Sequence, residues 1–180
     1  MARKKSRNAK KSSESDFAAL VLRLAVGPML ITHGHNKVWG GGGLAGTTRW
    51  FESLGLKPAH VHARLAAGTE IGAGALLTLG ALSPAPAAAA VGLMTVAART
   101  DHKGKGFFIF KGGWEYVGVV GAAAVASATL GSGKYSVDRL LGNQRKGARW
   151  GLAAAVLGVA NAAALIATSY KPEPTPPPAA

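Results

Sequence analysis

The sequence predicts an all-α integral membrane protein whose helices form a bundle across the bilayer. Charged residues make up only 16% of the 180 residues, and the chain contains 25 glycines. Five long stretches carry very few charges and are rich in alanine. Small residues fill a water-soluble core poorly, but in lipid they let helix backbones approach closely. The length corresponds to about one domain, so we expect a single bundle.

Five apolar stretches are the predicted membrane spans: residues 17–36, 63–82, 84–98, 113–130 and 150–170. A bilayer core needs about 20 residues of helix, and about 17 is the lower end of the range. Only the segment Ser-Pro-Ala-Pro separates the second stretch from the third. Proline marks tight turns, and a single helix through both stretches would be too long for one crossing. We therefore predict a hairpin at this point.

Both ends of the chain are predicted to be tails. Residues 1–16 contain six of the 21 basic residues and little to bury, so we expect a disordered cytoplasmic tail. Residues 171–180 are rich in proline, which cannot continue a helix. Five spans then place the C-terminal tail outside. The basic residues of 134–149 agree with this orientation, whereas those of 99–111 fall on the outer side and argue against it.

The charge pattern and the lack of cysteine exclude several classes of function. The net charge is +13, but the basic residues outside the N-terminal tail mostly flank apolar stretches. This distribution fits anionic lipid headgroups better than nucleic acid, which we do not expect as a partner. The absence of cysteine excludes disulfides, thiolate catalysis and cysteine-bound iron–sulfur clusters. Any redox role must therefore use a bound cofactor or a partner protein.

Three charged residues lie inside the predicted spans and need a physical explanation. They are Arg23 in the first span, Glu70 in the second and Glu115 in the fourth. A charge in the membrane costs a few kcal/mol on insertion scales, so each should find a partner. From helix depth we expect Arg23 to pair with Glu70, and Lys37 to pair with Glu115.

Two histidines extend this set into a candidate polar cluster near the outer surface. The cluster comprises Arg23, His33, Lys37, Glu70, His102 and Glu115. Opposite charges beside histidines would suit a quinone, a heme propionate or another anionic head group. The alternative is a structural ion pair together with histidines and lysines that anchor helix ends at the interface, as His35, His60 and His62 would. No histidine spacing matches a zinc motif, so no metal site is predicted.

The order of these motifs resembles the DoxX family of small bacterial membrane proteins. The resemblance rests on "LRLAVGPMLITHGHNKVWG", "SLGLKP", "LLTLGAL", "HKGKGFF", "GGWE" and "LGSGKYSVDRLL", and it covers residues 17–142. It implies a four-helix transmembrane bundle, to which this chain adds a fifth helix within residues 143–170. The polar and glycine positions that the resemblance marks are Arg23, Gly34, Lys37, Glu70, Gly106, Glu115, Tyr135, Ser136 and Asp138.

The resemblance also implies a place in respiratory or redox membrane assemblies of the bacterial inner membrane. We expect a non-catalytic accessory or assembly subunit whose partners are the lipid bilayer and other membrane subunits. The alternative is a quinone-binding oxidoreductase subunit of the quinol oxidase or thiosulfate:quinone type. No cofactor is predicted outright, although a quinone or a heme would be compatible with the polar cluster. A chain without cysteine or a nucleotide-binding motif is not expected to be catalytic alone.

Overall fold

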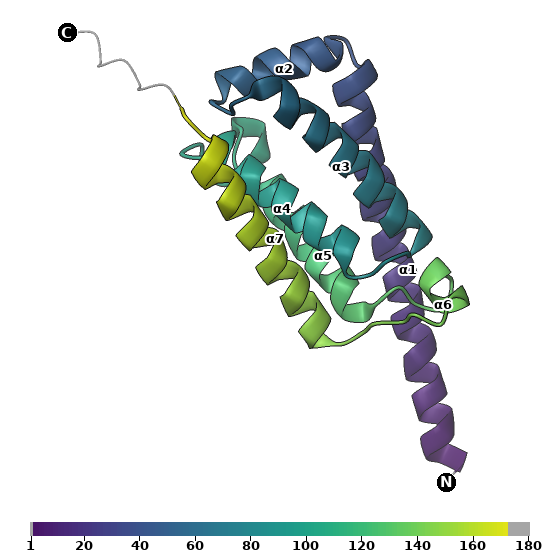
Figure 1. Ribbon diagram of the computed structural model, residues 1–180. Coiled ribbons are helices and arrows are strands. Elements are labelled where there is room, and N and C mark those ends of the chain that lie inside the picture. Colours follow the sequence, from purple (N-terminus) through teal and green to yellow (C-terminus); the bar gives the residue numbers. More distant parts are fainter. Residues whose placement is uncertain (1, 173–180) are drawn as a thin grey trace, which may run out of the picture.

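The computed structural model describes residues 2–172 of the chain, with side chains from residue 13 onward. Apart from one isolated bridge between Leu56 and Tyr170, the regular structure in this part of the chain is helical (Figure 1). The elements are α1 (Ala2–Trp39), α2 (Gly43–Ser53), α3 (Ala59–Leu79), α4 (Ala85–Thr100), a short 3-10 helix η1 (Ile109–Lys111), α5 (Glu115–Leu130), α6 (Val137–Leu140) and α7 (Ala148–Ser169).

Each of the five predicted spans coincides with one long helix, namely α1, α3, α4, α5 or α7. The predicted hairpin between the second and third spans is confirmed, because α3 ends at Leu79 and α4 begins at Ala85. Gly80 ends α3 in the left-handed conformation, with φ of 66°. Only glycine adopts this conformation without strain. A side chain here would also be 2.6 Å from the Arg23 guanidinium carbon.

The N-terminal segment differs from the sequence expectation. Residues 1–16 were predicted to be a disordered tail, but α1 already begins at Ala2. The segment contains no glycine or proline, and lysine, arginine, alanine and glutamate are good helix formers. The first span can therefore continue backward without interruption. Residues 173–180 of the predicted proline-rich tail lie outside the described residues.

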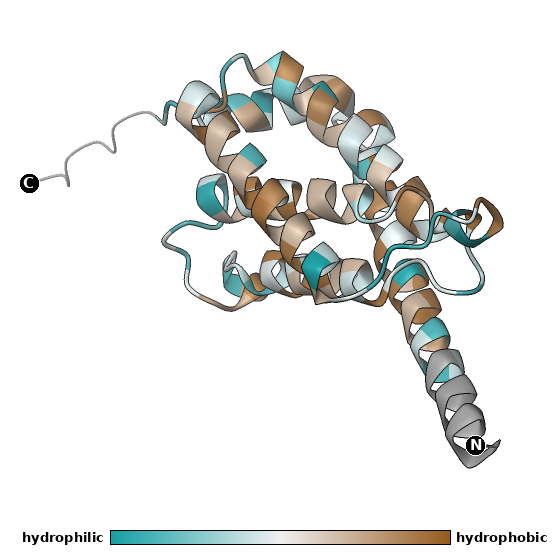
Figure 2. Cartoon of the chain, turned by 60° about the horizontal axis from the view of Figure 1, so that its bottom comes forward, coloured by the Kyte–Doolittle hydropathy of each residue, from teal (hydrophilic) through white to brown (hydrophobic). Residues whose placement is uncertain are grey.

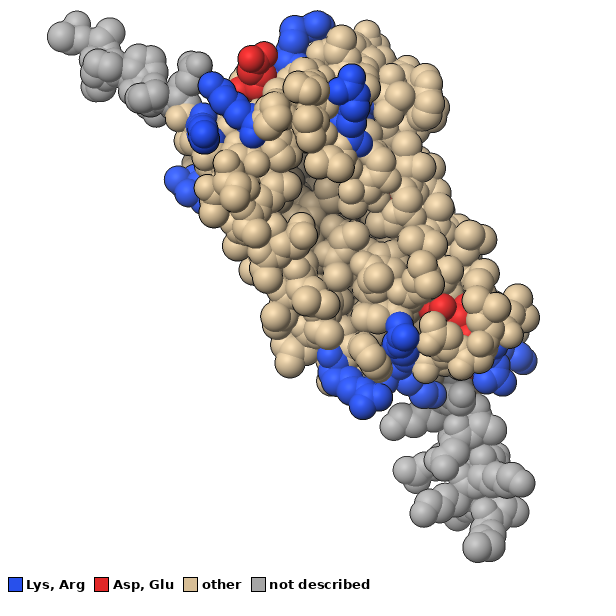
Figure 3. Space-filling view, viewed as in Figure 1, with Lys and Arg blue, Asp and Glu red and all other residues tan. Residues whose placement is uncertain are grey.

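The surface of the bundle has the distribution of charge expected of a membrane protein. In Figure 3, Lys and Arg side chains gather at the two ends of the molecule, and the belt between them is uncharged on the face shown. Large apolar side chains such as Leu24, Leu79, Val119 and Leu152 are more than half exposed. Figure 2 shows hydrophobic residues along the helices and hydrophilic ones mainly in the loops and at helix ends. An exposed apolar surface of this kind indicates contact with lipid.

Two helices are long and apolar enough to cross a bilayer on their own, residues 13–39 of α1 and the whole of α7. Helix α5 is apolar but has only 16 residues, as does α4. Helix α3 has 21 residues but carries several polar side chains. The helices are present where predicted, whereas the arrangement of four spans plus a fifth stays a prediction.

Glycines bring α1 and α3 into backbone contact. A Cβ added to Gly74 of α3 would lie 2.6 Å from the Gly27 carbonyl oxygen of α1. One added to Gly34 would lie 2.8 Å from the Ala67 carbonyl oxygen. Helices without a hydrophobic driving force in lipid associate through such small residues. This contact fixes which residues of α1 and α3 lie at the same height.

The C-terminal helix packs in the same manner on the other side of the bundle. Gly158 of α7 lies against α4, where a Cβ would be 2.6 Å from the Ala88 carbonyl oxygen. Gly151, two turns earlier, lies against Val125 and Thr129 of α5. Helix α7 is therefore an integral wall of the bundle, in contact with α4 and α5. Figure 1 shows it beside α4 along most of its length.

Arg23 closes the end of the bundle where α3 turns into α4. Its guanidinium Nε donates to the Leu77 carbonyl oxygen at 3.0 Å, and Nη2 donates to Thr78 O at 2.9 Å. Nη1 donates to the carbonyl oxygens of Ser132 and Tyr135 in the loop after α5. The side chain thus satisfies carbonyl groups at the C-terminal end of α3, where cations are favoured.

Asp138 completes this arrangement, which we call the Arg23–Asp138 latch. Its carboxylate accepts hydrogen bonds from the backbone N–H groups of Leu82 and Ser83 at 2.9 and 3.0 Å, and from the Ser132 hydroxyl at 2.7 Å. The side chain is almost completely buried. The expected pairing of Arg23 with Glu70 is therefore wrong. Arg23 lies level with the last turn of α3, about two turns from Glu70 at roughly 1.5 Å per residue.

We predict that Arg23→Gln lowers the thermal stability of the detergent-solubilised protein, because up to four carbonyl oxygens lose their donor, two of them in buried hydrogen bonds. Removal of a buried charged partner typically costs about 3–5 kcal/mol. Thermal unfolding followed by circular dichroism measures the loss, with the exposed Arg64→Gln as the matched control. Because Arg23 and Glu70 do not touch, the effects of Arg23→Gln and Glu70→Gln should add. Strong coupling between the two substitutions would contradict the assignment of Arg23 to the Arg23–Asp138 latch.

Candidate functional site: a cavity lined by the Lys37–Glu70 pair

An ion pair between α1 and α3 lies inside the predicted membrane region. The Lys37 Nζ donates to Glu70 Oε1 at 2.8 Å and lies 2.7 Å from Oε2. Side chains on a helix lean toward its N-terminus, so Lys37 reaches back along α1 past Gly34 to the level of Glu70. Gly34 allows the close approach, because a Cβ added there would lie only 3.0 Å from the Glu70 Cβ. The Lys37 and Glu70 side chains are only 13% and 8% exposed, so each charge compensates the other.

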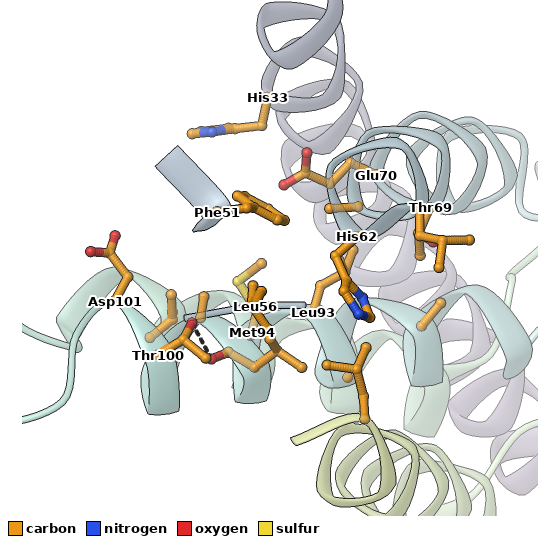
Figure 4. Close-up of a pocket in the computed structure, with 18 of the residues that line it drawn as sticks. His33, Phe51, Leu56, His62, Thr69, Glu70, Leu93, Met94, Thr100 and Asp101 are labelled. Atoms are coloured by element: carbon orange, nitrogen blue, oxygen red, sulfur yellow. Dashed lines mark hydrogen bonds between the residues drawn. The ribbon is translucent and has the colours of Figure 1, made fainter. Parts of the chain in front are cut away.

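The pair forms part of the wall of a cavity of about 640 Å³ between the helices. Helices α1, α2, α3, α4, α5 and α7 all contribute side chains to it. Most of the lining is apolar, and Figure 4 shows Phe51, Leu56, Leu93 and Met94 around its interior. A cavity of this size with a few polar groups is typical of a site for a small molecule or cofactor.

His62 is the most informative polar group in this wall. It lies on α3, is only 8% exposed, and its Nε2 has no hydrogen-bond partner in the part of the chain that the structure describes. In Figure 4 its ring lies among the side chains that line the cavity. A buried polar atom without a partner costs about 1–3 kcal/mol, so native proteins rarely leave one unpaired without a reason. A ligand in the cavity could supply that partner.

Thr69, two turns further along α3, is a second free hydrogen-bonding group. The other described threonines all donate to the carbonyl oxygen four residues earlier. The Thr69 hydroxyl makes no hydrogen bond in the described structure, although it lines the cavity. Seven residues separate His62 from Thr69, which places both on one face of α3. This face therefore offers two unused polar groups to the cavity.

The remaining polar residues lie toward the end of the cavity formed by the α2 and α4–η1 segments. His33 is exposed, and its ring packs on that of Tyr116 with 5.5 Å between centroids. His102 Nδ1 lies 2.6 Å from the Gly112 carbonyl oxygen, so it also fixes the loop before α5. The neighbouring Asp101 pairs with Lys105 at 3.0 Å. This end of the cavity is therefore more polar than its interior.

The structure brings together four of the six residues of the predicted cluster. His33, Lys37, Glu70 and His102 all line the cavity. Arg23 does not, because it belongs to the latch at the opposite end of α3. The prediction that Arg23 lies beside Glu70 assumed that both residues have the same depth in the membrane. It is wrong because the contact between Gly27 and Gly74 sets a different register between α1 and α3.

Glu115 also lies outside the cavity lining. Its Oε2 accepts a hydrogen bond from the Ile109 backbone N–H at 3.0 Å and thereby holds η1 against the start of α5. The expected pairing with Lys37 is therefore wrong, since Lys37 pairs with Glu70. A carboxylate at the start of a helix is favoured by the helix dipole and needs no cation there.

Polar residues of the cavity that the sequence did not predict include His62, Thr69 and Asn161. The position of His62 near the start of α3 is typical of an interfacial anchor, which is the alternative that the sequence leaves open for it. Its spacing of eight residues from Glu70 could have indicated a shared helix face. Asn161 is the polar residue in the middle of the apolar α7, and a polar side chain within a span is a sign of function. That signal was available in the sequence.

The fold and the cavity define a class: a helical membrane protein with a largely apolar internal cavity that contains a buried ion pair and unpaired hydrogen-bonding groups. Residues 18–103 match the model of the DoxX family. The resemblance predicted from the sequence is thus confirmed for residues 18–103, which are similar to the DoxX family. The predicted resemblance of residues 104–142 lies beyond the match. No curated protein and no solved structure gives a significant match.

We predict that Lys37→Met and Glu70→Gln each destabilise the protein more than the double variant does. Each single change leaves one buried group without its partner, whereas the double change removes both. A double-mutant cycle on thermal unfolding should give a coupling of about 1–3 kcal/mol. Glu52→Gln, on the exposed side of α2, is a matched control. Purely additive effects would show that the pair contributes nothing to stability.

Proposed function

We propose that the protein is a non-catalytic accessory subunit of a bacterial respiratory or redox membrane complex, and that its cavity binds a lipid-soluble redox molecule of the quinone class. The observation that supports ligand binding is that the buried His62 has an unpaired Nε2 in a cavity with largely apolar walls. The carbonyl oxygens of a quinone, or the hydroxyls of a quinol, would pair with His62 and Thr69. The apolar side chains would surround the ring and its chain.

The accessory role is favoured over an oxidoreductase acting alone. The chain has no cysteine, so a bound quinone would have to exchange electrons with a centre on another subunit. The DoxX domain also associates the chain with membrane proteins rather than with a soluble catalytic domain. The function proposed is therefore to hold the quinone within reach of a partner subunit, and the alternative is a quinone oxidoreductase subunit in its own right.

Purification in mild detergent tests the ligand directly. We predict that organic extraction of the wild-type protein releases a quinone, and that His62→Phe, which keeps the ring but removes the nitrogen atoms, releases much less. His60→Phe is the matched control, because His60 lies two residues earlier on α3 but is exposed and outside the cavity lining. A Soret absorption band in place of quinone would identify heme as the ligand. Equal quinone from all three proteins would exclude His62 as its partner.

A thiosulfate-dependent assay separates the accessory role from the alternative. If the subunit is accessory, purified protein loaded with quinone should not reduce it when thiosulfate is added. The same protein purified together with its cross-linked neighbours should yield subunits of a redox complex. Reduction of the quinone by the isolated chain would instead support the oxidoreductase.

The orientation follows from the positive-inside rule, with the N-terminus in the cytoplasm and five spans. The chain contains no cysteine, so a maleimide label can react only with the engineered cysteines. We predict that Ser13→Cys and Lys171→Cys react with a membrane-impermeant maleimide from opposite sides of the inner membrane. Labelling of both from one side would mean an even number of spans.

A further inference from the structure

We propose that α7 and α3 frame a lateral portal through which the ligand passes from the lipid into the cavity, and that Asn161 of α7 binds the ligand there. This inference rests on the proposed function for the identity of the ligand. It assigns a role to α7, which lies outside the residues that match the family model.

The geometry of the helices leaves the cavity open sideways between α3 and α7. Helix α3 packs on α1, α2 and α4, and α7 packs on α4 and α5. Leu65 of α3 and Leu157 of α7 both line the cavity, yet they are 55% and 61% exposed. Figure 3 shows the surface hollowed in this region, within the uncharged belt. A side chain that is both part of the cavity wall and exposed at an apolar surface marks an opening toward lipid.

The floor beneath this opening is smooth and apolar. Ala88, Ala89 and Gly92 of α4 line the cavity there, and Gly92 is in close contact with Gly158 of α7. These small residues leave room above α4 that larger side chains would fill. An extended hydrocarbon chain fits such a floor, because it needs an apolar surface without hydrogen-bonding groups.

Asn161 lies on the α7 side of the portal. Leu157, Asn161 and Leu165 follow one another at intervals of four residues, and all three line the cavity. The Asn161 amide makes no hydrogen bond in the described structure. An unpaired amide at membrane depth is unfavourable, so an interaction with the ligand would explain its presence in an otherwise apolar helix.

The charges around the cavity indicate that the head of this ligand is uncharged. Lys37 is neutralised by Glu70, and Asp101 is paired with Lys105. The lining groups that make no hydrogen bond in the described structure include the Nε2 of His62, the Thr69 hydroxyl and the Asn161 amide. A phosphate or carboxylate head would have to compete with Glu70 for Lys37. The chemistry therefore fits a neutral ring with carbonyl or hydroxyl oxygens, carried on an apolar chain.

The test uses the full chain in nanodiscs of zwitterionic lipid, with decylubiquinone and a tail-less ubiquinone as probes. Quenching of Trp50, which lines the cavity, reports binding, and Trp50→Phe gives the background. Asn161→Leu, which removes the amide at similar size, should weaken binding of both probes about tenfold. Asn161→Ser should restore part of the affinity, because its hydroxyl can still form a hydrogen bond.

A second pair of variants tests the portal separately from the hydrogen bond. Leu157→Trp narrows the opening and should slow the association of decylubiquinone several-fold, with a smaller effect on the tail-less probe. Val156→Trp is the matched control, because Val156 is similarly exposed on α7 but does not line the cavity.

The outcomes distinguish this inference from the proposed function. If the wild-type protein binds quinone but Asn161→Leu and Leu157→Trp behave like Val156→Trp, the portal and the role of Asn161 are wrong and the proposed function stands. If the wild-type protein binds neither probe, the proposed function fails and this inference falls with it. Displacement of decylubiquinone by a fatty acid at equal concentration would contradict the inference that the head group of the ligand is uncharged.

Discussion

The backbone contact between α1 and α3 sets the positions of Arg23, Lys37 and Glu70 relative to one another. Gly27, Gly34 and Gly74 remove the side chains that would otherwise separate the two helices. At this distance Lys37 reaches Glu70 directly. The same register places Arg23 level with the last turn of α3, where backbone carbonyl groups lack helical partners. A larger residue at any of these glycines would disturb both ends together.

Lys37 and Arg23, both on α1, stabilise the bundle in different ways. Lys37 meets an opposite charge, whereas Arg23 meets carbonyl oxygens and acts with Asp138 through the loop that they share. Arginine suits this second role because its planar guanidinium donates in several directions at once. The latch holds the connections after α3 and after α5, and so fixes the helices at that end. The cavity can then exist at the other end without loss of the fold.

The cavity follows from how the helices are shared between two groups. Helix α3 belongs with α1 and α2, and α7 belongs with α4 and α5, while contacts of α3 with α4 and of α1 with α5 join the groups. Apolar side chains fill the core between α1, α4 and α5. Between α3 and α7 apolar packing is confined to one end, where Leu165 packs on the cluster of Phe51, Leu56 and Ala63. Beside the remaining space, polar groups of His62, Thr69 and Asn161 make no hydrogen bond in the described structure. Unfilled volume and unpaired polar groups in the same place are a consistent sign of a binding site.

The sequence alone determined the helical class, the position of the five long helices and the hairpin after α3. These features depend on local composition, on glycine and proline, and on the length of apolar stretches, all of which can be read along the chain. It also indicated four of the cavity residues, because a charge or a histidine at a span end is conspicuous in an apolar sequence. The tertiary structure decided which charges pair. Arg23, Lys37, Glu70 and Glu115 could pair in several ways, and the choice depends on the register between helices that glycine contacts impose. It likewise decided that His62 is buried beside a cavity, since burial arises from the packing of distant segments rather than from neighbours in the chain.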